Sequence, residues 1–121
     1  MSPRLRIDLE REEYRLGDAV TGKVLALSGG ASRSLKAWLE YREKTKDYKE
    51  VAASVEHRTL NEAPIADGAS FDFELTLPAD GYPNYESEHG ELWWELNVKS
   101  DEPGRDTHER RRIEVGPAPV R

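Results

Sequence analysis

The sequence predicts an all-β protein folded as an immunoglobulin-like antiparallel β-sandwich. Short runs alternate apolar and polar residues, which is the period of a strand with one buried face. Turn-forming pairs rich in glycine, aspartate and proline separate these runs. At 121 residues the chain is long enough for one such domain. We expect a single sandwich over residues 1–115, followed by an exposed tail, GPAPVR, at 116–121.

The expected strands follow one another along the chain, and each is read from its alternation. The runs are RLRIDL at 4–9, AVTGKVLAL at 19–27, SFDFELTL at 70–77, ELWWELNVK at 91–99 and RRIEV at 111–115. The third run is the clearest, because every second residue is a large apolar one and Pro78 then stops strand pairing.

The segment Ser34–Asn61 is rich in lysine, glutamate, alanine and leucine, which all favour helix. Its apolar residues do not form one helical stripe, however. At a period of two, both halves alternate: Leu35 to Tyr41 in the first and Val51 to Val55 in the second. We therefore expect a long hairpin that turns near Lys46–Asp47, with a helix as the alternative.

The stretch YRLGDAVTGKVLAL, Tyr14 to Leu27, resembles the opening of the arrestin fold. In that family an aromatic residue, a glycine and an acidic residue precede a strand of the form V-x-G-x-V. The pattern has a physical sense here. Gly17 permits the turn, Asp18 tolerates its geometry, and Gly22 allows a neighbouring chain to approach closely.

The second half of the chain is also similar to arrestins. The run from Phe71 to Pro78, a loop with Pro83 and Tyr85, and the run from Leu92 to Val98 match the order of the family pattern, which covers Leu5 to Val115. The nearest resemblance is to microbial arrestin-like proteins, including the sporulation-control family, and to the arrestin-like subunit of retromer. The resemblance implies a sandwich that binds other proteins and does not catalyse a reaction. The phosphate-sensing lysines and buried ionic cluster of receptor-binding arrestins do not map onto this sequence, so receptor sensing is not implied.

Composition excludes several classes of function. Charged residues make up 35% of the chain and its net charge is -6, which argues against a general nucleic-acid binder. No apolar run approaches the roughly 18 residues of a membrane span, and the first residues lack the apolar core of a signal peptide. Without cysteine there is no disulfide and no thiolate metal site. We expect a cytoplasmic protein.

The chemistry-bearing residues do not predict an enzyme. His57, His89 and His108 share no metal-ligand spacing and are expected at the surface. There is no glycine-rich phosphate loop and no cysteine nucleophile. We therefore expect no cofactor and no bound metal. The weaker alternative is a metal-dependent site at His89, which lies beside Glu86 and Glu88.

The tryptophans are the candidate interaction residues. Alternation assigns Trp94 to the core and leaves Trp93 among charged residues, and Trp38 has the same kind of neighbours. Arg110 and Arg112 share one face of the last run. Three explanations compete for the two outward tryptophans: cover by arginine or lysine stems or by a loop, a patch for a partner or a second copy, or a sugar platform.

The sequence thus predicts a non-catalytic protein-interaction or scaffold module of arrestin-like type. Its partner is an unidentified protein, and a homodimer through edge strands would supply the second sandwich that arrestins carry in one chain. The alternative function is a carbohydrate-binding sandwich that uses exposed tryptophans.

Overall fold

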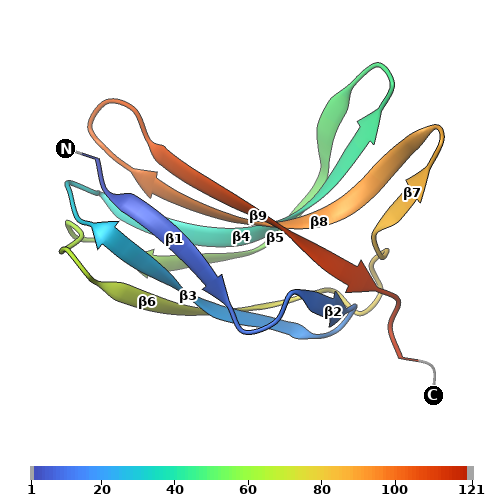
Figure 1. Cartoon of the computed structure of the whole chain (residues 1–121), viewed down its shortest axis with the longest axis horizontal. Helices are drawn as coiled ribbons and strands as arrows, with labels where there is room; N and C mark the ends of the chain where they lie inside the picture. Colours follow the sequence, from blue (N-terminus) through green and yellow to red (C-terminus); the bar gives the residue numbers. More distant parts are fainter. Residues whose placement is uncertain (1, 120–121) are drawn as a thin grey trace.

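The computed structural model describes residues 2–119, which fold into strands without any helix (Figure 1). This confirms the all-β prediction. Within the described residues, no helix is long and apolar enough to cross a membrane. The strands are β1 (Arg4–Leu9), β2 (Glu13–Arg15), β3 (Ala19–Ser28), β4 (Ser34–Thr45), β5 (Lys49–Asn61), β6 (Ser70–Thr76), β7 (Tyr85–Ser87), β8 (Gly90–Asp101) and β9 (Thr107–Gly116).

The strands form two sheets that pack face to face (Figure 1). The smaller sheet has the order β1-β3-β6, and the larger has the order β2-β9-β8-β4-β5 with β7 also paired to β8. All pairs are antiparallel except β2 with β9, where Tyr14 lies opposite Val115 in a parallel register. The predicted antiparallel sandwich is therefore confirmed, with one short parallel pair at the edge of the larger sheet.

The segment Ser34–Asn61 is the predicted hairpin and not a helix. β4 and β5 are its two strands, and the turn at 46–48 closes it. Inward-facing Leu35, Ala37 and Leu39 are fully buried. Burial of this alternating face outweighs the helix propensity of the intervening charged residues, because propensity is a weaker term than tertiary packing.

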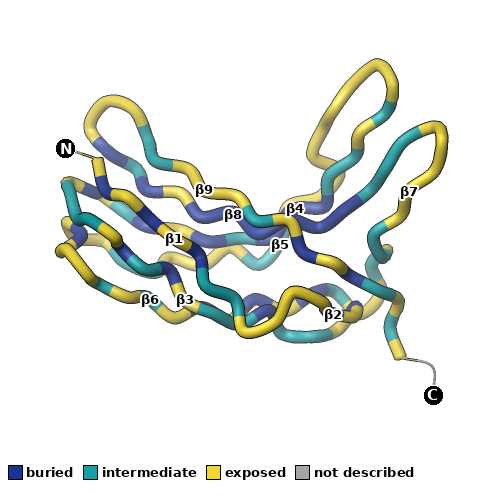
Figure 2. The backbone as a smooth tube through the Cα atoms, viewed as in Figure 1, coloured by how far each residue is buried: buried dark blue, intermediate teal, exposed yellow. Residues whose placement is uncertain are grey.

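The core lies between the two sheets, where the buried residues of one sheet face those of the other (Figure 2). Both faces contribute fully buried aliphatic side chains. The largest of them are Leu35, Leu39, Leu75, Leu77, Leu96, Ile113, Val20, Val24 and Val98. Within the predicted strand SFDFELTL, the side chains of Phe73, Leu75 and Leu77 are buried as expected, while Phe71 is half-buried.

Two glycines have the roles that the arrestin resemblance suggests. Gly17 has a φ of +92°, a conformation that favours glycine, in the turn before β3. A Cβ on Gly22 would clash with the backbone carbonyl oxygen of Asp8 on β1. Only glycine therefore lets β1 and β3 approach as closely as they do at this point.

The larger sheet extends beyond the smaller one at one end. β4, β5 and β8 have 12, 13 and 12 residues, whereas β1 and β6 have 6 and 7. The surplus length rises from the sandwich as the β4–β5 and β7–β8 hairpins (Figure 1). At this end, part of the sheet's inner face has no strand of the smaller sheet beneath it.

The end of the described chain departs slightly from the predicted boundary. β9 continues to Gly116, and Ala118 packs against the core. Residues 120 and 121 of the predicted tail lie outside the described residues. The division into one sandwich over 1–115 and an exposed tail at 116–121 stays a prediction.

Candidate functional site

The predicted interaction residues meet on the outer face of the larger sheet. In the strand register, Asn97 on β8 lies between Trp38 on β4 and Arg110 on β9. One step along β8, Glu95 has Arg112 as its neighbour on β9. We call this surface the outer-face network; its members are Trp38, Glu40, Arg42, Trp93, Glu95, Asn97, His108, Arg110 and Arg112.

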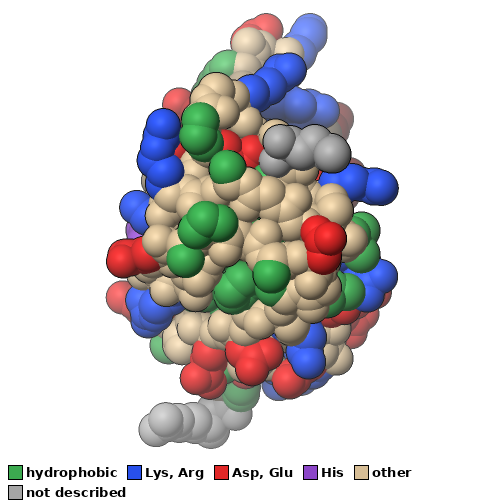
Figure 3. All heavy atoms as spheres, turned by 90° about the vertical axis from the view of Figure 1, so that its left-hand side faces the viewer, with side chains coloured by type: hydrophobic (Ala, Val, Ile, Leu, Met, Phe, Trp, Pro, Cys, Tyr) green, Lys and Arg blue, Asp and Glu red, His purple; other side chains and the backbone are tan. Residues whose placement is uncertain are grey.

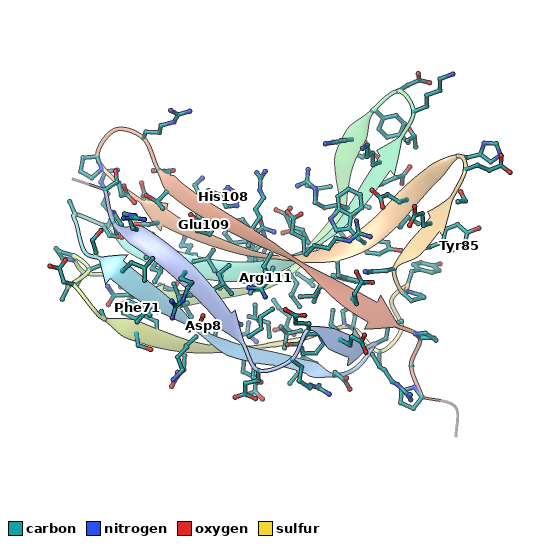
Figure 4. All side chains as sticks on the ribbon, viewed as in Figure 1. Asp8, Phe71, Tyr85, His108, Glu109 and Arg111 are labelled. Carbon is teal, nitrogen blue, oxygen red and sulfur yellow. The ribbon has the colours of Figure 1, made fainter. Side chains whose placement is uncertain are left out.

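Arg111 points the other way, as the alternation along β9 predicts (Figure 4). Its guanidinium donates to the carbonyl oxygen of Ile7 at 3.3 Å and to Glu12 at 3.1 Å. The side chain thus ties the larger sheet to β1 and to the segment before β2. It serves the sandwich edge, and only its neighbours Arg110 and Arg112 belong to the outer face.

Two glutamates with like charge lie directly opposite each other at the centre of the network. Glu40 and Glu95 are register partners and are 8% and 7% exposed. Such a pair is destabilising by itself. Arg42 compensates it, with Nη1 2.9 Å from Glu40 Oε2 and 3.7 Å from Glu95 Oε1. Arg110 adds a second positive charge 3.8 Å from Glu95.

The two outward tryptophans are bound to this carboxylate pair. Trp38 Nε1 donates to Glu40 at 2.8 Å, and Trp93 Nε1 donates to Glu95 at 3.3 Å. The Arg112 guanidinium lies 5.2 Å from the centre of the Trp93 ring, a cation–π distance. Trp93 is therefore only 9% exposed, although it faces away from the core. Of the three explanations for its position, cover by arginine side chains is the one that the contacts match.

Two histidines far apart in the sequence converge on Trp38. The rings of His57 and His108 each lie 5.6 Å from the Trp38 ring, with interplanar angles of 13° and 42°. His57 arrives there through an irregularity in β5 at Glu56, whose φ is +59°.

His108 also lies 2.8 Å from Asn97 Oδ1 through its Nε2. Desolvation lowers the pKa of His108, and the charge of Arg110 lowers it further. The neutral imidazole is therefore the form that suits this position. Asn97 itself has no exposed surface, and its Nδ2 has no hydrogen-bond partner in the described chain.

The described residues do not assemble the metal site that was the weaker alternative. Within residues 2–119, no group of three or more histidine, cysteine, aspartate or glutamate side chains is arranged to hold a metal ion. His89 lies in the turn between β7 and β8, where its backbone N–H donates to Ser87.

The outer-face network also offers little open aromatic surface for a sugar. Trp93 is covered by Arg112, and one neighbour of Trp38 is the stacked ring of His57. A sugar platform needs an exposed ring face, so the contacts do not favour the carbohydrate-binding alternative. That Trp38, Trp93, Arg110 and Arg112 contact a protein partner stays a prediction.

A second surface, which the sequence analysis did not identify, lies where the larger sheet projects. We call it the tyrosine groove. It has a volume of about 550 Å³ and is lined by Tyr41, Glu43, Ala52, Ala53, Tyr82, Pro83, Tyr85 and Leu92. Tyr41 and Leu92 belong to the core-facing side of β4 and β8, so the groove continues the apolar inner face beyond the smaller sheet.

The loop that forms one wall of the groove is firmly held. Tyr41 donates through its hydroxyl to the carbonyl oxygen of Pro83 at 2.9 Å, and Trp94 Nε1 donates to that of Tyr82 at 2.8 Å. Asn84 donates to the carbonyl oxygen of Ile113 at 2.8 Å. These bonds hold the loop against β4, β8 and β9. The backbone that carries the Tyr82 and Tyr85 side chains is therefore fixed in place.

Those two tyrosines are the most exposed large apolar side chains of the described chain. Tyr82 is 72% and Tyr85 is 61% exposed; Tyr85 is the first residue of β7, at the end where the hairpins rise (Figure 4). At the opposite end of the sandwich, apolar side chains are scattered and do not gather (Figure 3). The sequence signal for the groove was the tetrapeptide YPNY at 82–85, two aromatic residues around a proline in a loop.

The tyrosines differ in how their hydroxyls are used. Tyr14, Tyr41 and Tyr48 each donate to a protein oxygen. Within residues 2–119, the hydroxyls of Tyr82 and Tyr85 have no protein partner. Desolvation raises the pKa of Tyr41, with the charge of Glu43 as a second cause, so Tyr41 remains a donor. The groove therefore presents an apolar floor with two free hydroxyl donors at its rim.

Comparison with known proteins gives the fold but not a close relative. No family model matches the chain, and no curated protein sequence matches it significantly. Among solved structures, the chain is similar to Spo0M, a sporulation control protein from Bacillus subtilis. The TM-score is 0.75 with 21% sequence identity over 95% of this chain and 49% of the Spo0M chain. A β-glucosidase from Listeria innocua matches with a TM-score of 0.42 and 16% identity over 98% of this chain and 17% of that one, too low to indicate a shared fold.

The chain spans about half the length of the Spo0M chain that it matches. The likeness covers nearly the whole of the present sandwich, and the all-β architecture agrees with it. The fold expected from the motif around Gly17 and Gly22 is thereby confirmed: the chain has an arrestin-like β-sandwich fold of the kind found in Spo0M.

Proposed function

We propose that the chain is a non-catalytic protein-interaction module that receives its partner in the tyrosine groove. The observation that carries this proposal is the groove itself, an apolar hollow of about 550 Å³ beside two tyrosines that are 72% and 61% exposed. Exposed apolar surface of this kind marks interaction sites. Tyrosine is among the residues that contribute most to binding energy at interfaces.

The likeness to Spo0M supports a regulatory role. Spo0M is described as a sporulation control protein, and we infer that the present chain acts in cellular regulation as a scaffold and not as an enzyme. A cytoplasmic location is part of this proposal. Because the chain spans half of the Spo0M chain, the identity of the regulated process is left to experiment.

We keep the predicted outer-face residues as a second, smaller contact area. The side chains of Arg110 and Arg112 are 57% and 43% exposed, so they can reach a partner. Trp93 lies against the Arg112 guanidinium and would contribute mainly by holding that arginine in place, and the Trp38 ring lies beside His108.

The test uses the full chain immobilised on a support and the native lysate. The wild type, a Tyr82→Ala/Tyr85→Ala double variant and a Leu27→Ala variant are compared. Leu27 is the matched control because it is 48% exposed on β3, away from the groove. We expect a stoichiometric partner on the wild type and on Leu27→Ala, and its loss from the double variant. Equal capture by all three chains would contradict a role for the groove.

Self-association through edge strands is a separate part of the proposal. β5 ends the larger sheet, has 13 residues and is mostly exposed. An exposed edge of this length offers unpaired backbone groups to another strand. We expect sedimentation velocity to show a dimer that grows with protein concentration. A monomer over the whole accessible concentration range would remove the dimer and leave the groove proposal intact.

A further inference from the structure

We infer that the free edge of β6 accepts an extended segment of a partner protein as an added antiparallel strand, and that this segment carries two basic residues with an apolar residue between them. The inference goes beyond the proposed function, because β6 belongs to the smaller sheet and contributes no residue to the tyrosine groove. Three properties of the edge lead to it: its regularity, its unpaired backbone groups and its carboxylates.

β6 is the longest regular edge among the described strands. It ends the smaller sheet (Figure 1), and all 7 of its residues pair with β3 without a register shift. β5 is longer, but three register shifts interrupt its pairing with β4. β2 and β7 have 3 residues each, and at the edge of β1 the carbonyl oxygen of Ile7 accepts from Arg111. Native proteins protect edge strands by shortness, bulges, cover or charge, and β6 has only the last.

Backbone groups of alternate residues point to this open edge. Ala26 N–H donates to the carbonyl oxygen of Ala69 at 2.8 Å just before β6, and Leu77 N–H donates to that of Asp18 at 2.9 Å just after it. Because the direction of hydrogen bonding alternates along an antiparallel strand, residues 71, 73 and 75 also bond to β3. The groups that point outward are those of Ser70, Asp72, Glu74 and Thr76. Within residues 2–119, these backbone groups have no partner.

The side chains of the same residues give the edge a negative charge. Asp72 and Glu74 are exposed and take part in no ion pair within the described chain. Lys23 is the register partner of Asp72 but lies beyond ion-pair distance from it. Glu74 lies opposite the uncharged Thr21. Basic residues opposite Asp72 and Glu74 in an added strand complement both carboxylates.

The inner side of the edge suits an apolar residue. Phe73 is 6% exposed, and Phe71 on the same strand is half-buried (Figure 4). The residue between the two basic ones lies opposite Phe73 and points to this inner side, since side chains alternate along a strand. There it packs beside the exposed part of Phe71. The edge therefore selects the order basic, apolar, basic.

A second copy of this chain does not fit the edge in full register. Two β6 strands that pair antiparallel over their whole length are centred on Phe73, which sets Asp72 of one copy opposite Glu74 of the other. Like charges directly opposite each other are destabilising. The net charge of -6 adds repulsion between copies. The occupant is therefore a basic segment of another protein.

The probe is a synthetic peptide of about seven residues, the length of β6, that alternates valine with lysine and is titrated into the full chain. One control peptide replaces the lysines with glutamates. The other keeps the lysines but carries a methyl group on each lysine backbone nitrogen, which removes the N–H groups that pair with β6. We expect the probe to bind at least about tenfold more tightly than either control. Equal binding by the N-methylated control would show attraction by charge alone and would overturn the inference, as would no binding by the probe.

Variants locate the strand on the protein. Asp72→Asn/Glu74→Gln should weaken binding of the probe by about fivefold, the effect of two exposed ion pairs. Glu86→Gln/Glu88→Gln is the matched control, because it removes the same charge from exposed residues of the β7–β8 hairpin. We expect this control to bind the probe as the wild type does. Equal weakening in both variants would contradict a site at β6.

Hydrogen exchange followed by NMR reads the backbone directly. In the free protein, the amide protons of Asp72, Glu74 and Thr76 should exchange quickly, because those of 71, 73 and 75 are the ones bonded to β3. The probe should slow exchange at Asp72, Glu74 and Thr76 by at least about tenfold. Protection that appears at 82–85 instead would place the peptide in the tyrosine groove and overturn the inference. Tyr82→Ala/Tyr85→Ala should leave the affinity for the probe unchanged, so the two proposals stand or fall separately.

Discussion

The molecule has two aromatic surfaces that use their polar groups in opposite ways. In the outer-face network, the indole N–H groups of Trp38 and Trp93 both donate hydrogen bonds to carboxylates of the same chain. In the tyrosine groove, the hydroxyls of Tyr82 and Tyr85 are left for another molecule. The comparison teaches that residue type alone does not mark a binding surface. What matters is whether the polar end of an aromatic side chain is already satisfied.

The difference has a structural cause. Outward residues on β4, β8 and β9 have neighbours on both sides in a continuous sheet, so long side chains can pair across strands. Glu40, Glu95 and Arg42 do so, and their side chains are 11%, 10% and 18% exposed. The loop around Tyr82 has no strand beyond it, and its side chains project past the edge of the packing. Side chains in the middle of a sheet therefore pair with one another, whereas the side chains of a loop at the end of a sheet remain available for another molecule.

The largest expected effect belongs to the side chain that links the core to the groove. Trp94 is 2% exposed, its ring centre lies 4.9 Å from that of Tyr41 at an interplanar angle of 39°, and its Nε1 donates to the Tyr82 carbonyl oxygen. Trp94→Ala should lower the free energy of unfolding by about 3–5 kcal/mol, because it leaves a cavity in the core. Urea unfolding followed by circular dichroism measures the change. A loss no larger than that of Trp93→Ala would show that the two faces of β8 are equally packed.

The next effect tests the charge balance of the outer-face network. Arg42→Leu removes the charge that lies between Glu40 and Glu95. We expect a loss of about 2–3 kcal/mol, somewhat below the range for a fully buried pair because Arg110 remains nearby. The same denaturation experiment measures it, with Arg6→Leu as control because the Arg6–Asp8 ion pair is half exposed. If both variants lose equally little, the network is solvated in solution and its closure is not a property of the fold.

Trp93→Ala should have a smaller effect. The alternation in the sequence alone predicts a surface position and a loss of about 1 kcal/mol or less. Its 9% exposure beneath Arg112 raises the expected loss to about 2 kcal/mol, since an arginine stem packs on the ring but remains partly solvated. Thermal unfolding compared with Trp94→Ala and the wild type measures it. A loss of stability below that of an ordinary surface substitution would show that Arg112 does not cover the Trp93 ring, and that the ring is free to contact a partner.

How far the sequence predicts the molecule differs between these regions. Period-two alternation is a local signal, so it correctly places Trp93 and Trp94 on opposite faces and identifies the hairpin over Ser34–Asn61. It cannot predict the cover of Trp93, which depends on the register that brings Arg112 beside it from β9. Register is set by packing over the whole sheet and not by the residues of one strand.

The groove and the histidine pair are non-local for the same reason. Tyr41 and Pro83 are joined by a hydrogen bond across 42 positions of sequence. His57 and His108 meet only because both flank Trp38 from β5 and β9. Spacing rules recognise ligands that lie close together in the chain. They therefore give no sign that these two histidines are neighbours in the folded protein. The tetrapeptide YPNY was visible, but nothing in it tells that the loop turns its rings outward.

The smallest expected effect is a pH dependence in the outer-face network. The pKa of His108 is lowered, first by desolvation and then by Arg110, with Lys99 in the same sense and Glu40 and Glu95 opposing it. A folded-state pKa below the usual value means that protons bind the unfolded chain more readily. The contribution of His108 to stability is therefore fully present above about pH 6.5, the unfolded value, and is lost as the pH falls through the lower folded-state pKa. The wild type should thus lose more thermal stability than His108→Gln between neutral and mildly acidic pH, since glutamine can still bond Asn97 and does not titrate. Parallel melting curves for the two chains would show that the imidazole is solvated, and the contact at 2.8 Å with Asn97 would then contribute nothing that depends on its charge.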